Sequence, residues 1–217
     1  MNTQTNAESR SLIFEHLGEI AQALASPARL RIIQHLTNRP SHVEEISQFI
    51  GQPIGSASQH LQKLKQVGLV SIEKQGTSRL YRLANPKVVE AWLALQNLAA
   101  EVDPMIREEE EKIAPSEVCA SCDIEDVIEQ VQNKKAVLID VRSLADAEST
   151  PVKGAIHIPA EGILAKAGDL PKSKTIYLFC RGRYCERATT AVLALRKKGF
   201  KAYRLKANCI QIGTSLQ

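Results

Sequence analysis

The sequence predicts two domains: a mainly helical N-terminal domain that ends in a β-hairpin, and a C-terminal α/β domain whose parallel sheet is flanked by helices. Apolar residues recur at helical spacing in the first part of the chain and then alternate over residues 69–83. Beyond residue 123, short apolar runs of strand length alternate with helical segments. An acidic stretch bracketed by prolines separates the two parts. We therefore expect domains at 1–102 and 123–217, with a linker at 103–122.

Composition places the chain among ordinary globular proteins. Of its 217 residues, 44% are hydrophobic, and the net charge of +4 is compatible with nucleic acid without requiring it. No apolar run reaches the roughly 18 residues that a membrane span needs. The polar N-terminus lacks the apolar core of a signal peptide, so we expect no membrane association and a cytoplasmic location.

The stretch from Ile54 to Val70 predicts a helix with two different faces. Leu61, Leu64 and Val67 form an apolar face that can dock on a core, and Gly68 is placed to end the helix. The other face is polar and basic without a carboxylate, which suits pairing with base edges and phosphates in a major groove. An ordinary amphipathic surface helix is the alternative. The candidate DNA-contacting residues here are Ser56, Ser58, Gln59, His60, Gln62 and Lys63.

Three helices are expected before this one, at residues 12–25, 28–36 and 42–50. Ser26-Pro27 is typical of a helix start, and Gly51 closes the third helix. A short helix, a turn over residues 52–55 and a second helix with a polar front together make a helix-turn-helix.

Residues 69–83 alternate as strands do, and Gln75-Gly76 lies where a hairpin must turn. Lys74, Arg79 and Arg82 put positive charge on this hairpin, where it could contact phosphates. The hairpin could also be purely structural. Its position directly after the helix-turn-helix favours a winged helix-turn-helix that binds DNA.

The segments "LASPARLRIIQHL", "SASQHLQKLKQVGLV" and "QGTSRLYRL" resemble the ArsR-type winged helix-turn-helix repressors over about residues 10–100. The resemblance implies a homodimer that binds a palindromic double-stranded operator and leaves it when an inducer acts. A last helix at 88–102 would pair with the first helix in the dimer. Metal-sensing cysteines and histidines of that family are missing from the matching helices, and His42 with Glu44 and Glu45 is interpreted as a solvated face. We expect neither a metal nor a cofactor.

The linker holds seven acidic residues between Glu101 and Glu117, and the run 108–111 is interpreted as a solvated helix end. Cys119 and Cys122 follow as a C-x-x-C pair. Such a pair can be half of a zinc site, a redox pair or incidental, and we assign it no function.

The C-terminal domain is expected to form a parallel sheet between helices. Its apolar run at 136–141 ends in an acid, as buried parallel strands often do. The other expected strands and helices are strands at 155–159, 175–180 and 201–205, and helices at 124–131 and 186–198.

The candidate reactive residue is Cys180, at the end of a predicted strand and before a predicted helix. Loop N–H groups, the helix dipole and the adjacent arginines favour an anion there, which would stabilise a thiolate or a persulfide. A buried inert cysteine is the alternative. The residues expected to hold an anionic donor are Arg181, Gly182, Arg183 and Tyr184.

"LIDVRS", "KGAIHIPAEG" and "YLFCRGRYCERA" resemble a rhodanese domain over about residues 120–206. The resemblance implies that Cys180 carries sulfane sulfur as a persulfide and that Asp140 and Arg142 are chiefly architectural. Cys185 departs from the arginine that many rhodaneses have at the end of this loop. The C-terminus, with Cys209, also lacks the usual glycine turn and tryptophan-bearing helix.

We therefore expect a homodimeric repressor whose rhodanese-like domain takes up sulfane sulfur on Cys180, which Cys185 then resolves. One alternative is a working sulfurtransferase with an autoregulatory DNA-binding domain. A weaker alternative is an arsenate-type oxyanion reductase using the same two cysteines.

Overall fold

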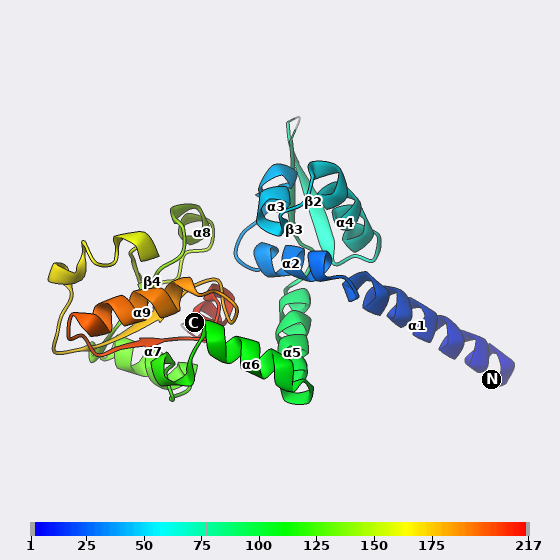
Figure 1. Ribbon diagram of the computed structural model, residues 1–217. Helices are drawn as coiled ribbons and strands as arrows, with labels where there is room; N and C mark the ends of the chain where they lie inside the picture. Colours follow the sequence, from blue (N-terminus) through cyan, green and yellow to red (C-terminus); the bar gives the residue numbers. More distant parts are fainter. Residues whose placement is uncertain (1–2, 77, 216–217) are drawn as a thin grey trace. The chain divides into compact units, whose positions relative to one another are not determined.

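The computed structural model describes residues 3–76 and 78–215 and divides into two compact units, Met1–Leu95 and Gln96–Gln217 (Figure 1). Each unit has its own core. Helix α5 (Pro86–Val102) is continuous and carries the chain from the first unit into the second. None of the helices in the described ranges is both long and apolar enough to cross a membrane.

The N-terminal unit is a winged helix-turn-helix. Its antiparallel sheet has the order β1 (Ser41–His42), β3 (Ser78–Leu83), β2 (Val70–Gln75), with Lys74 opposite Arg79 near the turn between β2 and β3. Gly76 adopts φ +61° at that turn, whereas Thr77 at the tip lies outside the described residues. Strand β1 was not anticipated from the sequence. The elements before α5 are α1 (Thr3–Leu24), α2 (Pro27–Leu36), β1 (Ser41–His42), α3 (Val43–Ile50), α4 (Ile54–Gln66), β2 (Val70–Gln75) and β3 (Ser78–Leu83).

The predicted apolar faces of α2, α3 and α4 form one core. Leu61 and Leu64 of α4 are fully buried against Ile33 of α2 and Ile46 of α3. Gly68 adopts φ +76°, a conformation that side chains disfavour, and this ends α4 as predicted.

Helix α1 differs from this pattern because its apolar residues lie on the surface of the single chain. Leu12, Ile13 and Leu17 are all more than half exposed, and Phe14 is 67% exposed. A contiguous exposed apolar stripe of this kind marks a surface that another molecule covers.

The C-terminal unit contains the predicted parallel sheet, and its four strands have the order β5-β4-β6-β7. Strands β4 and β6 are its two inner strands. The elements after α5 are α6 (Pro104–Ile113), α7 (Ile124–Gln132), β4 (Ala136–Asp140), α8 (Leu144–Ser149), β5 (Ile156–His157), β6 (Thr175–Phe179), α9 (Arg187–Lys197), β7 (Ala202–Arg204), α10 (Cys209–Ser215) and the short 3₁₀ turns Ser116–Val118, Ala160–Gly162 and Ala167–Asp169.

Alternate residues of the inner strands face two different cores. Ile139 and Leu178 pack with Val192 of α9 on one face, whereas Leu138 packs with Val127 of α7 on the other. Both faces of a parallel sheet are thus covered, which explains why its strands are continuously apolar.

Two expectations need correction. The acidic run in the predicted linker is not fully solvated, because Glu110 of α6 is only 7% exposed, and α6 belongs to the second compact unit. The C-terminus, although it lacks the expected turn and tryptophan, still completes a layer. Helix α10 places Ile212 and Cys209 in the same core as α7.

Candidate functional site

The exposed face of α4 carries the residues predicted to contact DNA. Gln59, Gln62 and Lys63 are exposed, while Ser56 and Ser58 are half-buried near the start of the helix. His60 is also half-buried, and its Nε2 lies 3.1 Å from Oε1 of Gln52 in the preceding turn. The polar front of α4 is therefore backed by a fully apolar side.

The wing carries the other predicted DNA contacts. Lys74 and Arg79 are exposed and face each other across β2 and β3, so they place two cations close together. Arg82 instead forms an ion pair with Glu73, at 2.9 Å. Of the three basic residues predicted on the wing, Arg82 alone has a carboxylate partner among the described residues.

His42 has a structural role at the start of α3. Its Nδ1 lies 3.1 Å from the carbonyl oxygen of Arg79, and its backbone N–H donates to Glu45. In the described part of the chain, no three His, Cys, Asp or Glu residues come together in a group that could hold a metal ion.

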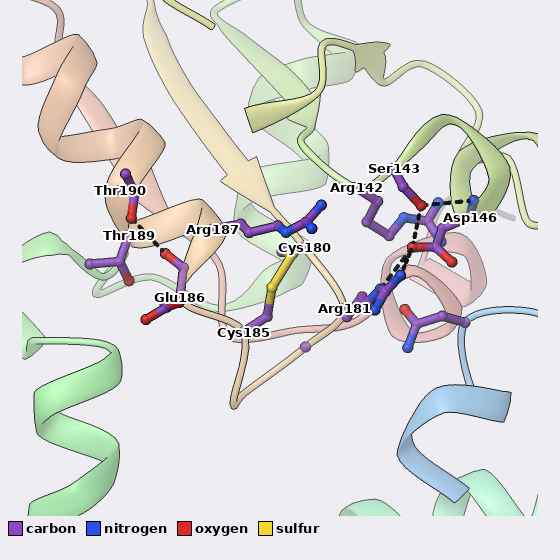
Figure 2. Close-up of a disulfide and its surroundings, with 12 residues drawn as sticks. Arg142, Ser143, Asp146, Cys180, Arg181, Cys185, Glu186, Arg187, Thr189 and Thr190 are labelled. Carbon is purple, nitrogen blue, oxygen red and sulfur yellow. Dashed lines mark hydrogen bonds and ion pairs between the residues drawn. A yellow bond between two sulfur atoms is a disulfide. The ribbon is translucent and has the colours of Figure 1, made fainter. Parts of the chain in front are cut away.

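The cysteine loop, residues 180–185, connects β6 to α9. Cys180 follows the last residue of β6 and is 1% exposed, and its Sγ is joined to that of Cys185 as a disulfide (Figure 2). The two Cα atoms lie 6.3 Å apart, within the range that disulfides span. Gly182 adopts φ +105°, which a residue with a side chain would tolerate poorly. The loop therefore turns at Gly182 and brings two thiols into bonding reach.

Arg181 of the loop is directed at a carboxylate of its own domain. Its guanidinium pairs with Asp146 of α8 at 2.7 Å, and Ser143 donates to the same carboxylate oxygen (Figure 2). Asp146 is fully buried, so this contact fixes one side of the loop to α8.

Arg183 is directed at two other helices. Its Nε lies 2.6 Å from Oε1 of Glu110 on α6, and its Nη1 donates to Oδ1 of Asn97 on α5 at 2.8 Å. The next residue, Tyr184, lies near the same Glu110 carboxylate. Burial and this carboxylate raise the pKa of the Tyr184 hydroxyl. Arg181 and Arg183 thus meet different carboxylates, although the sequence predicted that both would hold one anionic donor.

Arg204, which the sequence analysis did not single out, holds the main chain of the loop. It lies in β7, is 1% exposed, and donates to the carbonyl oxygens of Gly182 (3.2 Å) and Arg183 (2.8 Å). On its other side it donates to the carbonyl oxygen of Ile113 (3.1 Å) and to Thr189 Oγ1 (2.8 Å). Its burial lowers the pKa of the guanidinium. The sequence did hold a signal that could have identified Arg204, because an arginine inside an otherwise apolar strand needs buried partners.

Asp140 and Arg142 form a buried ion pair at the end of β4. The two side chains are joined at 2.7 Å, and Arg142 also donates to the hydroxyl and carbonyl oxygens of Thr150. The pairing with Asp140 raises the pKa of Arg142 despite the opposing effect of burial. These contacts fit the architectural role that the resemblance implied for this pair.

The remaining thiols lie apart from the loop. Burial raises the pKa of Cys119, and its Sγ lies 3.6 Å from the carbonyl oxygen of Ala114. Cys122 lies 3.7 Å from the hydroxyl of Tyr177, whose pKa rises to about 12 through burial and this contact. Burial also raises the pKa of Cys209.

Two protein families match the chain in the places that the geometry indicates. Residues 24–73 match the helix-turn-helix domain family, and residues 123–207 match the rhodanese-like domain family. Over 201 residues the chain is 27% identical to HTH-type transcriptional regulator Rv0324 of Mycobacterium tuberculosis, covering 92% of this chain and 88% of that protein.

Shorter matches cover the N-terminal part. The chain is 30% identical over 91 residues to the uncharacterized HTH-type transcriptional regulator Rv0081 of M. tuberculosis, covering 42% of this chain and 80% of that protein. An NMR structure of the homodimeric winged helix-turn-helix DNA-binding domain of a possible ArsR-family regulator from Mycobacterium bovis is 31% identical. That match covers 43% of this chain and 86% of the other, with a TM-score of 0.41.

The chain therefore belongs to the ArsR-like helix-turn-helix transcriptional regulators. It carries a rhodanese-like domain behind its DNA-binding domain.

Proposed function

We propose that this regulator is a homodimeric repressor that responds to sulfane sulfur through Cys180 and Cys185. The observation that carries the proposal is the pairing of the two cysteines within one short loop of a rhodanese-like domain. A sulfur atom delivered to the first thiol can thus be displaced by the second without any large movement of the chain.

The chemistry follows from thiol–disulfide exchange. The Cys180 thiolate attacks a sulfane sulfur of a polysulfide, the donor's S–S bond breaks, and the shortened donor leaves with the electron pair. The Cys185 thiolate then attacks Sγ of the Cys180 persulfide, and hydrosulfide leaves with the electron pair of the broken bond. Sulfane sulfur is thereby reduced to sulfide while the two cysteines are oxidised to a disulfide.

The donor site belongs to the same proposal. Gly182 and Tyr184 contribute main-chain N–H groups to the loop beside Cys180, and such groups favour an anion. Arg181 and Arg183 add positive charge to the loop while their guanidinium groups pair with Asp146 and Glu110. An anionic polysulfide or thiosulfate is proposed to bind the N–H groups of this loop, with the two paired guanidinium groups beside it.

DNA binding requires two copies in this proposal. The exposed apolar stripe of α1 supplies a surface for the dimer, and Leu98 of α5 is similarly exposed. Two-fold symmetry would present one α4 to each half of a palindromic operator. The residues proposed to contact this DNA are Ser56, Ser58, Gln59, His60, Gln62 and Lys63 of α4, with Lys74, Arg79 and Arg82 of the wing.

The test combines intact-mass spectrometry with DNA-binding anisotropy on the same samples. The reduced protein is treated with sodium tetrasulfide, and a duplex that the protein selects from a random pool serves as the DNA probe. We expect an added sulfur atom or a loss of two hydrogen atoms, located at Cys180 and Cys185, that parallels a loss of DNA affinity. Cys180→Ser should abolish both changes. Modification with unchanged DNA affinity would contradict the proposal.

A second candidate is a sulfurtransferase whose DNA-binding domain serves autoregulation, and the rhodanese-like match favours it. Turnover separates the two. Thiocyanate formed from thiosulfate and cyanide over many cycles, dependent on Cys180, would support the enzyme. Modification that stops after one equivalent would support the repressor.

A further inference from the structure

We propose that Arg183 relays the state of the cysteine loop to helix α5 through Glu110 and Asn97. This inference rests on the proposed sulfur response and names the contact that carries it. Glu110 and Asn97 are then positioning residues, which act through Arg183 without touching the sulfur donor.

The contact joins three segments that are far apart in the sequence. Arg183 lies between the two cysteines of the disulfide, so its position depends directly on how the loop is closed. From there its guanidinium reaches Glu110 on α6 at 2.6 Å and Asn97 on α5 at 2.8 Å. Because Glu110 is 7% exposed and Arg183 is mostly buried, solvent screens their attraction less than it would on the surface.

The main chain of the loop is also tied to the end of α6. Arg204 bonds the carbonyl oxygens of Gly182 and Arg183, and its other guanidinium nitrogen bonds the carbonyl oxygen of Ile113 at the end of α6. Thr189 Oγ1 donates to that same Ile113 oxygen at 2.8 Å. The loop and the end of α6 therefore share one buried arginine, and a shift of either changes the contacts of the other.

Helix α5 provides the path onward. Its last third carries Asn97, whereas its first half packs in the core of the DNA-binding unit, where Val88 and Val89 are buried. Trp92 Nε1 donates to Oε1 of Gln34 on α2 at 2.8 Å. One continuous helix thus holds both the partner of Arg183 and part of the core beneath the DNA-reading helix.

The two arginines of the loop have partners in different parts of the structure. Arg181 is paired with Asp146 inside the rhodanese-like domain, while Arg183 is paired with the helices that lead to the DNA-binding unit. Closing the disulfide places the Arg183 guanidinium against Glu110 and Asn97. This contact favours an arrangement of α5 in which the protein binds DNA more weakly.

The experiment measures DNA affinity of the full-length protein before and after treatment with sodium tetrasulfide. The variants are Glu110→Met and, as a matched control, Glu109→Met, which removes the preceding and exposed carboxylate of the same helix. Asn97→Ala serves as a second variant because this residue is exposed, so its loss leaves the core intact.

In the wild type and in Glu109→Met we expect affinity to fall on treatment by roughly 5- to 150-fold, the usual range of coupling between sites. In Glu110→Met and Asn97→Ala this change in affinity should be several-fold smaller. The DNA affinity of the untreated, reduced protein and the mass change at Cys180 should stay as in the wild type. If Glu110 and Asn97 had a merely structural role, their substitution would also alter the DNA affinity of the untreated, reduced protein.

The outcomes separate this inference from the proposed function. If the wild type takes up sulfur without any loss of affinity, the proposed sulfur response is wrong. If the wild type responds and both relay variants respond equally, the relay is wrong while the sulfur response stands. Should Glu110→Met fail to fold, the response of Asn97→Ala decides the question alone.

Discussion

The basic side chains that belong to the two candidate sites are placed in opposite ways. In the N-terminal unit Lys63, Lys74 and Arg79 are exposed on the polar front of α4 and on the wing, above a core that is almost entirely apolar. In the C-terminal unit Arg142, which follows β4, and Arg204, in β7, are fully buried on either side of β6, the strand that leads into the cysteine loop. Positively charged side chains therefore lie on the surface at the first site and in the interior at the second.

The difference follows from what each site must do. A DNA-binding surface gains affinity when exposed cations meet phosphates and release counterions, so its charges remain in water until DNA arrives. A reactive loop needs a defined geometry, and a buried arginine that bonds several carbonyl or carboxylate oxygens supplies it. Removing a buried charge should therefore affect folding, whereas removing an exposed one should affect DNA binding alone.

The largest effect is expected for Arg142→Met. This substitution leaves the Asp140 carboxylate buried without its partner, and breaking such a pair costs about 3–5 kcal/mol of stability. Urea unfolding followed by far-UV circular dichroism should show an earlier transition for the C-terminal unit. Fluorescence of Trp92, the single tryptophan, should report unchanged unfolding of the N-terminal unit.

Two controls test the physical reason. Arg187→Met removes an exposed arginine next to the loop and should change stability by about 0.5 kcal/mol or less. Replacing both members of the pair, Asp140→Leu with Arg142→Met, should cost less than Arg142→Met alone, because no charge is then left buried. Equal costs for the single and double variants would refute the assigned cause.

A smaller effect is expected for Lys63→Ala on the surface of α4. If Lys63 of each protomer contacts one phosphate, its loss from both copies should reduce the slope of log affinity against log salt by about 1.8, which is about 0.9 for each contact. Stability should be unchanged because the side chain is exposed. Lys197→Ala, an exposed lysine of α9, is the matched control, and the same slope change in both variants would exclude a specific role for Lys63.

The smallest effect concerns the thiols outside the loop. Burial raises the pKa of both Cys119 and Cys209, so less thiolate is present at pH 8 than for an ordinary cysteine. In the reduced protein, iodoacetamide should label both slowly, and labelling should still accelerate as the pH rises above 8. Peptide mass spectrometry measures the rates, and in urea the two thiols should react as ordinary cysteines do.

Much of the fold could be predicted because it depends on local patterns. The apolar spacing of Leu61 and Leu64 identified the buried side of α4, and the apolar run before Asp140 identified an inner strand. The position of Cys180, directly after a strand and before a helix, was also predicted correctly, whereas its reactivity stays a prediction. Strand β1 could not be predicted, since two residues carry no period and the contacts of Ser41, with Tyr81 of β3 and with the ring of His35, come from other segments of the chain.

The partners of the loop arginines could not be predicted either. Which carboxylate meets Arg183 depends on how α6 packs, and the acidic run around Glu110 gave no sign that one of its members is buried. Arg204 shows the same limit, because its four partners come from three separate segments of the chain: the end of α6, the cysteine loop and α9.

The sequence by itself determined the two domains, their order, the amphipathic helix α4 of the helix-turn-helix, and the position of the cysteine loop between a strand and a helix. These depend on residue type and short-range spacing, which the chain carries before it folds. The tertiary structure alone decided which charges are buried, which helix each arginine of the loop reaches, and how Arg204 joins the loop to the end of α6. Such contacts connect residues nearly a hundred positions apart, so their geometry exists only after the sheet and its helices have packed.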